Sequence, residues 1–174
     1  MKLTTETPAR RLPMQWLPLL ILAAALLPFS GYILAAASGA SLHPPRWELW
    51  ARISPTLQLH IAAALSALVI GSVLMLRPKG RAVHKVLGWT WVAAMVVTAV
   101  SSFFLTGLNG DAFSLIHILS GWTLVALPMG VYAIRRRNVE RHRRTMSGMF
   151  YGGLLFAGAF TFLPGRFMFE MFFG

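Results

Sequence analysis

The sequence predicts an all-α membrane protein, a bundle of five transmembrane helices forming a single domain over residues 1–174. Hydrophobic residues make up 56% of the chain and charged residues only 12%, whereas soluble domains carry about 25% charged residues. The basic residues gather in short segments between apolar runs long enough to cross a bilayer. The absence of cysteine excludes disulfides, thiolate metal sites and cysteine-ligated iron–sulfur clusters.

The first apolar run, residues 14–37, follows a polar tail over residues 1–12 and predicts a transmembrane span. It carries no histidine, so we expect it to lie at the periphery of the bundle. A cleaved signal peptide is the competing interpretation, because AAASGA resembles a cleavage site. The run is, however, longer than the apolar segment of such peptides. Residues 38–55 then form an outer loop, in which we interpret His43 as an ordinary loop residue.

Four further apolar runs, separated by polar or basic turns, predict a four-helix core over residues 56–163. These runs cover residues 56–76, 84–105, 112–134 and 145–163. The first and last connections are basic, RPKGR at residues 77–81 and RRRNVERHRR at residues 135–144. The middle connection, residues 106–111, is a turn rich in glycine and asparagine. Residues 164–174 form the C-terminal tail.

The basic residues are strongly biased towards one side of the membrane. The N-terminal tail, residues 77–85 and residues 135–144 together hold 13 of the 16 lysines and arginines. With five spans, these three segments share one side, so the positive-inside rule places the N-terminus in the cytoplasm and the C-terminus in the periplasm. The net charge of +11 therefore reflects orientation in the membrane and does not indicate nucleic-acid binding.

Four of the five histidines lie at span ends, and this topology sorts them into two pairs. His60 and His117 enter from the outer side, on the second and fourth spans. His84 and His142 stand at the cytoplasmic ends, where the third and fifth spans begin. Each leaflet therefore holds one pair drawn from two different helices, and bundle cores commonly bind cofactors between facing helices.

Small residues accompany these histidines at helical spacing. Gly88 follows His84 by four positions, and Gly121 follows His117 by four, so each helix leaves room for a flat group beside the imidazole. Close helix packing is the alternative use of such glycines. Hydroxyl side chains inside the third span are expected to bond to their own helix: Thr98, Ser101 and Ser102.

Two histidines per layer fit a haem better than a bare metal ion. Zinc takes four protein ligands, or three with an open position, and no cysteine or suitably placed carboxylate completes either layer. A haem needs two axial ligands, so the sequence predicts two b haems, the outer on His60 and His117 and the inner on His84 and His142. Doubly ligated iron favours electron transfer over oxygen activation. Basic residues at the layer edges are candidates to pair with the propionates: Arg81, Lys85, Arg144 and Arg166.

The segments HKVLGWTWVAAM, FSLIHILS, RHRRTMSGMFYGGLLFAG and FLPGR resemble a family of uncharacterised bacterial membrane proteins, the domain of unknown function 2306, over residues 56–167. This resemblance implies the bacterial inner membrane. The histidine layout alone resembles the di-haem proteins of the cytochrome b-561 type. That second resemblance implies a transmembrane oxidoreductase that passes electrons from a quinol or small donor to an acceptor.

Two other functions are compatible with the same residues. A structural or assembly protein would use the histidines as interfacial side chains, without a cofactor. A metal-handling transporter would bind ions through them. The spans contain no acidic residue, whereas a cation-coupled carrier usually buries one, which argues against transport.

A reporter fused after Gly174 tests the orientation. We expect periplasmic activity, because the 13-to-3 bias in basic residues fixes the N-terminus inside. Cytoplasmic activity would reverse the leaflet assigned to every histidine.

Overall fold

The computed structural model describes residues 38–105 and 115–174, together with positions 30 and 34. Apart from positions 30 and 34, the predicted first span lies outside the described residues, and so does the turn at 106–111. Within the described part all regular structure is helical, in agreement with the predicted fold class.

Three helices of the described part are long and apolar enough to cross a membrane: α4 (Pro55–Leu76), α5 (Ala82–Ser102) and α6 (Leu115–Arg135). A continuous helical segment follows, made of α7 (Val139–Gly148), the π-helix η3 (Met149–Phe156) and α8 (Ala157–Phe160). Two short helices complete the described part: α3 (Trp47–Arg52) and α9 (Phe167–Phe172). Membrane crossing by the α7–η3–α8 segment, the predicted fifth span, stays a prediction.

Local sequence explains where α4 begins and ends. The Ser54 hydroxyl accepts a hydrogen bond from the backbone N–H of Leu57 at 3.3 Å, and Pro55 occupies the first helical position, which suits its fixed φ. At the other end, Lys79 donates to the carbonyl of Met75 at 2.7 Å. Gly80 then adopts a φ of 85°, a conformation that glycine adopts without strain. The chain can therefore reverse within the basic turn and begin α5 at Ala82.

The fourth helical segment begins earlier than the sequence predicts, at Val139 instead of residue 145. Arg137 has a φ of 60°, which ends α6, and the Asn138 side chain caps the new helix by accepting from Arg141 N at 2.9 Å. Hydropathy marks where a chain enters lipid, whereas a cap marks where a helix begins. His142 therefore lies inside the first turns of α7, not in the loop before the helix.

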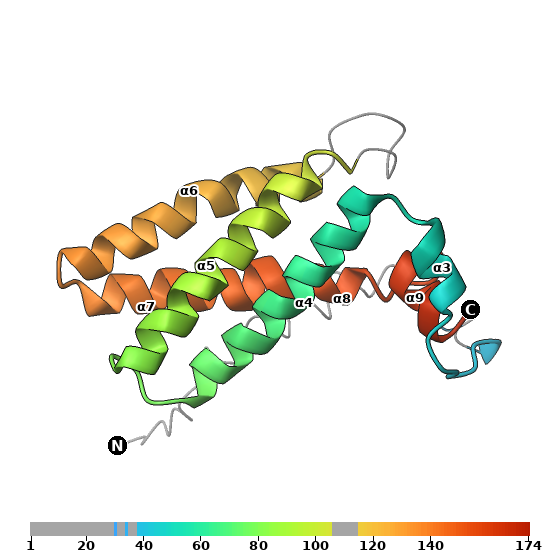
Figure 1. The fold of residues 1–174 in the computed structure, drawn as a ribbon, viewed down its shortest axis with the longest axis horizontal. Coiled ribbons are helices and arrows are strands. Elements are labelled where there is room, and N and C mark those ends of the chain that lie inside the picture. The colour runs from blue at the N-terminus through green and yellow to red at the C-terminus, as the bar shows by residue number, and fades with distance from the viewer. Residues whose placement is uncertain (1–29, 31–33, 35–37, 106–114) are drawn as a thin grey trace, which may run out of the picture.

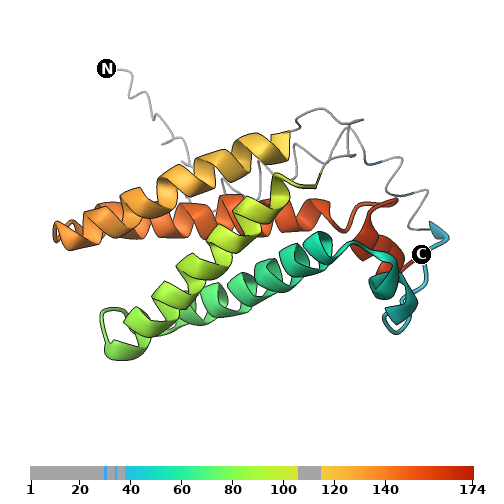
Figure 2. The same cartoon turned by 45° about the horizontal axis from the view of Figure 1, so that its top comes forward.

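The described helices form two antiparallel hairpins, α4–α5 and α6–α7, which cross each other (Figures 1 and 2). Contacts of α5 with α6 and of α4 with η3 close the arrangement into a ring. Both basic turns lie at one end of the bundle, and α3, α9 and the C-terminus lie at the other (Figure 1). The fold thus collects the positive charge of both turns at one end, the end that the positive-inside rule assigns to the cytoplasm.

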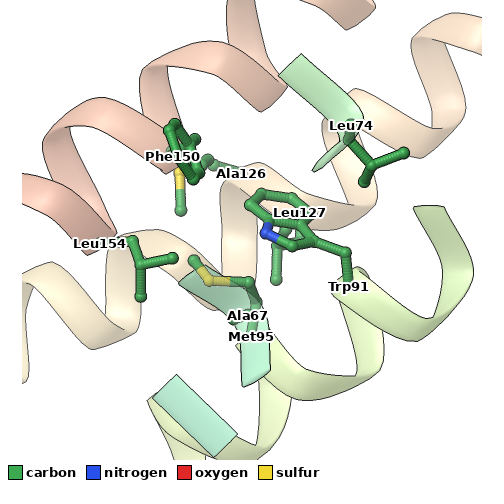
Figure 3. Packing of buried hydrophobic residues seen from close by; sticks show 9 residues of the cluster. Ala67, Leu74, Trp91, Met95, Ala126, Leu127, Phe150 and Leu154 are labelled. Carbon is green, nitrogen blue, oxygen red and sulfur yellow. The ribbon is translucent and has the colours of Figure 1, made fainter. Parts of the chain in front are cut away.

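The centre of the ring is apolar. Trp91 and Met95 of α5 pack against Leu127 of α6 and Phe150 of η3, with the small residue Ala67 of α4 beside them (Figure 3). All five residues are buried.

The outer surface of the helices is also apolar. Val69 of α4 is 63% exposed, Val86 of α5 66% and Ile118 of α6 71%, whereas polar side chains such as Ser102 and Ser120 are buried. This distribution fits a lipid environment, in which polar groups are satisfied inside the protein.

A clasp at the outer end joins the first loop to α9. The backbone N–H of His43 donates to Phe172 O and that of Arg46 to Met171 O, both at 3.1 Å. The Arg46 guanidinium donates to Glu170 O at 2.7 Å and lies 4.0 Å from the Glu170 carboxylate. The ring of His43 contacts the carbonyls of Pro44 and Gly174. His43 therefore belongs to this contact between the first loop and the C-terminal residues, and its described hydrogen bonds involve none of the other four histidines.

Replacing Gly71 by alanine tests the packing at the centre of the ring. A Cβ there would lie 2.6 Å from the Phe150 ring and 2.7 Å from Trp91 Nε1, and both rings are buried. We expect Gly71→Ala to lower the free energy of unfolding by about 1–3 kcal/mol, measured by denaturant titration in detergent. Gly158→Ala is the control, since a Cβ at Gly158 meets nothing within 4 Å. Equal stability of the two variants would contradict the packing described here.

Candidate functional site: two layers of histidine

His60 lies near the outer end of α4 and faces α5. Its Nδ1 is 3.0 Å from the Ser101 hydroxyl, and that hydroxyl is also 3.0 Å from the carbonyl oxygen of Thr98. A carbonyl only accepts, and serine has one proton to donate. Both bonds therefore form together only if His60 Nδ1 carries a proton and donates it to Ser101. The lone pair of His60 then lies on Nε2.

His117 lies near the beginning of α6 and is 4% exposed. Its ring centroid is 5.9 Å from that of Phe103, with the planes tilted by 55°, and Phe103 directly follows α5. One turn further into α6, the Ser120 hydroxyl is 2.5 Å from that of Ser102 on α5. Ser102 also lies 2.8 Å from the carbonyl of Ala99. The outer end of α5 thus contacts both outer histidines, through Ser101 on one side and Phe103 on the other.

His142 lies on α7 at the basic end of the bundle. Its Nδ1 lies 2.9 Å from the backbone carbonyl of Gly130 on α6. Because a carbonyl only accepts, Nδ1 carries the proton and donates it, and the lone pair lies on Nε2. His142 and His60 therefore have the same tautomer, each fixed by a neighbouring helix.

His84 stands in the first turn of α5, half-buried, and interacts electrostatically with His142 and Lys79. It lines a small cavity of about 100 Å³ between the ends of α4 and α5, beside Arg77 and Arg81. His84 and His142 thus lie at the same basic end of the bundle, near enough for their charges to interact. Ligation of a cofactor by the four histidines stays a prediction.

The glycines that follow two of the histidines have free space beside them. A Cβ on Gly88 would meet nothing within 4 Å, and one on Gly121 would meet only Phe103, at 3.9 Å. Glycines at close helix contacts in this structure have no such space, because a Cβ on Gly71 or Gly130 would approach neighbouring side chains to 2.7 Å or less. Within the described residues, Gly88 and Gly121 are therefore not packing glycines.

The basic residues predicted to pair with a cofactor lie at the two ends of the bundle, and all four are exposed. Arg81 and Lys85 stand at the beginning of α5 and Arg144 on α7, whereas Arg166 precedes α9 at the opposite end. The described part of the chain contains one ion pair, Arg46–Glu170. Among the described residues, the four cations therefore have no carboxylate partner.

The contacts of three serines between helices at this site were not predicted from the sequence: Ser101, Ser102 and Ser120. The expectation that hydroxyls bond to their own helix is correct for Ser101 and Ser102, yet these hydroxyls also contact His60 and Ser120 on neighbouring helices. Ser120 follows His117 by three positions, a helical spacing that places it near the histidine.

Comparison with known proteins identifies a family. A family model described as "Predicted membrane protein (DUF2306)" matches residues 57–171, which confirms the resemblance inferred from the sequence segments. No curated protein and no solved structure matches the chain. Because the family model covers well over half of the sequence, the chain belongs to the DUF2306 family of predicted membrane proteins.

Proposed function

We propose that this protein is a membrane-bound b-type cytochrome that holds one haem in each histidine layer and transfers electrons between the two faces of the membrane. The observation that carries the proposal is the arrangement of His60, His117, His84 and His142. Each end of the bundle holds two of them, on two different helices.

Hydrogen bonding of the imidazoles supports a ligand role. Histidines that bind a metal usually donate their other ring N–H to a carboxylate, a backbone carbonyl or water, which fixes the tautomer and the ring orientation. His60 donates from Nδ1 to Ser101 at 3.0 Å, and His142 donates from Nδ1 to Gly130 O at 2.9 Å. Each layer thus contains an imidazole whose Nε2 is available as a ligand.

The number of ligands favours haem over an ion bound by protein groups alone. Among the described residues, no group of three or more His, Cys, Asp or Glu side chains comes together, whereas zinc sites use three or four. A bis-histidine haem would supply a reversible one-electron couple without an open coordination position. Gly88 and Gly121 leave room beside the helices, and basic residues at both ends can neutralise propionates: Arg81, Lys85, Arg144 and Arg166. The donor would be a quinol or another small reductant.

A structural function is the second candidate, and the same hydrogen bonds favour it. His60–Ser101 joins α4 to α5, and His142–Gly130 joins α7 to α6. Hydrogen bonds between membrane helices stabilise a bundle by about 0.6–2 kcal/mol each. In a structural protein, these histidines would stabilise the fold without any cofactor.

Alanine variants of the histidines distinguish the two functions. We expect the purified wild-type protein to show a b-type reduced-minus-oxidised absorbance spectrum. His60→Ala and His117→Ala should both lose the outer haem, because no cysteine is present to replace the missing ligand. His84→Ala and His142→Ala should both lose the inner haem. The measurement is haem per polypeptide together with the difference spectrum.

His43→Ala is the matched control, because His43 contacts the outer clasp and should leave the haem content unchanged. Colourless wild-type protein from haem-replete cells, with His60→Ala merely less stable, would establish the structural function instead. The assignment of ligands would be contradicted if the two variants of a pair, His60→Ala and His117→Ala or His84→Ala and His142→Ala, lost different haems.

Leucine at Gly88 or Gly121 tests the space beside the cofactors. Because neither position is closely packed in the described structure, the variants should insert and fold, yet the added side chain should exclude the haem of its own layer. Ala93→Leu is the control, since Ala93 is exposed on the same helix as Gly88. Haem content per polypeptide gives the result, and full retention in both glycine variants would remove these glycines from the proposed sites.

A further inference from the structure

A groove outside both histidine layers lies between α6 and the α7–η3 segment. Its volume is about 360 Å³. Trp122, Ala126 and Met149 line it together with Gly148 and Gly152, and a Cβ on either glycine would meet nothing within 4 Å. Within the described part of the chain, the groove is thus an open, largely apolar channel along two helices that lie side by side (Figure 2).

One end of the groove is positively charged. Arg144 lines it in the second turn of α7, the helix that follows the basic turn after α6, and is exposed. The acid on α7, Glu140, does not pair with it, since Arg46–Glu170 is the ion pair found within the described residues. An apolar channel that ends in an unneutralised cation at the membrane boundary matches a lipid with an anionic headgroup.

We propose that this groove binds an anionic phospholipid of the cytoplasmic leaflet, with an acyl chain along Gly148 and Gly152 and the phosphate at Arg144. This proposal assigns Arg144 to the lipid phosphate and leaves Arg81 and Lys85, at the beginning of α5, as the partners of the inner propionates; it does not otherwise depend on the haem assignment. The competing occupant is the segment 14–37 of the same chain. That segment contains no aspartate or glutamate and so could not neutralise Arg144, which favours the lipid.

Thermal unfolding of the purified full chain in detergent tests the proposal. Phosphatidylglycerol should raise Tm, because a ligand that binds only the folded state stabilises it, and phosphatidylcholine with the same acyl chains should not. Arg144→Gln should lose most of this shift, whereas Arg143→Gln, one position away and outside the groove, should keep it. Gly152→Leu should lose the shift by filling the groove, whereas Gly158→Leu, equally uncrowded, should keep it.

Photo-labelling locates the lipid directly. Phosphatidylglycerol with a diazirine on its acyl chain should label peptides of α6 and η3, and unlabelled phosphatidylglycerol should compete. Equal Tm shifts for Arg144→Gln and Arg143→Gln, or labelling only outside α6 and η3, would overturn the proposal.

Disulfide formation tests whether segment 14–37 occupies the groove instead of a lipid. Since the chain has no native cysteine, the only disulfide that can form within one chain of the double variant Gly152→Cys/Leu26→Cys joins this segment to the groove. Efficient disulfide formation by that pair would place segment 14–37 in the groove and overturn the lipid site.

Discussion

The hydrocarbon core of a bilayer offers no hydrogen-bond partner, and this constraint explains how the polar side chains of this protein are arranged. Ser101 and Ser102, at the outer end of α5, bond to carbonyls of their own helix and at the same time contact His60 on α4 and Ser120 on α6. Three helices therefore meet at one polar junction, above an apolar centre around Trp91. The outer histidines are held on either side of this helix end.

The same hydrogen bonds stabilise the helix contacts and orient the imidazoles, so their existence alone does not separate a structural protein from a cytochrome. The proposed haem sites need two things that the described residues supply. The hydrogen bonds of His60 and His142 leave the lone pair of each imidazole on Nε2, and Gly88 and Gly121 leave space that the described helices do not fill. Haem content decides between the two functions.

The span boundaries could be predicted because apolar runs end at strong signals. Pro55 after the capping Ser54 and the turn before Ala82 place the bounds of α4 within one residue, and those of α5 within three residues, of the expected ones. The start of α7 could not be predicted from hydropathy, because the helix begins in a charged segment capped by Asn138. Contacts between helices, such as Ser102–Ser120, depend on how the hairpins cross, which periodicity within one helix does not determine.

Low-temperature electron paramagnetic resonance of the oxidised, purified protein tests the central claim most directly. Iron with two imidazole ligands is low-spin, so the account predicts low-spin ferric signals from two haems per chain, with His60 and His117 as ligands of one and His84 and His142 of the other. A high-spin signal would mean that the iron has an open coordination position, and the absence of any haem signal would mean that the histidines hold no haem. Either result would contradict the account.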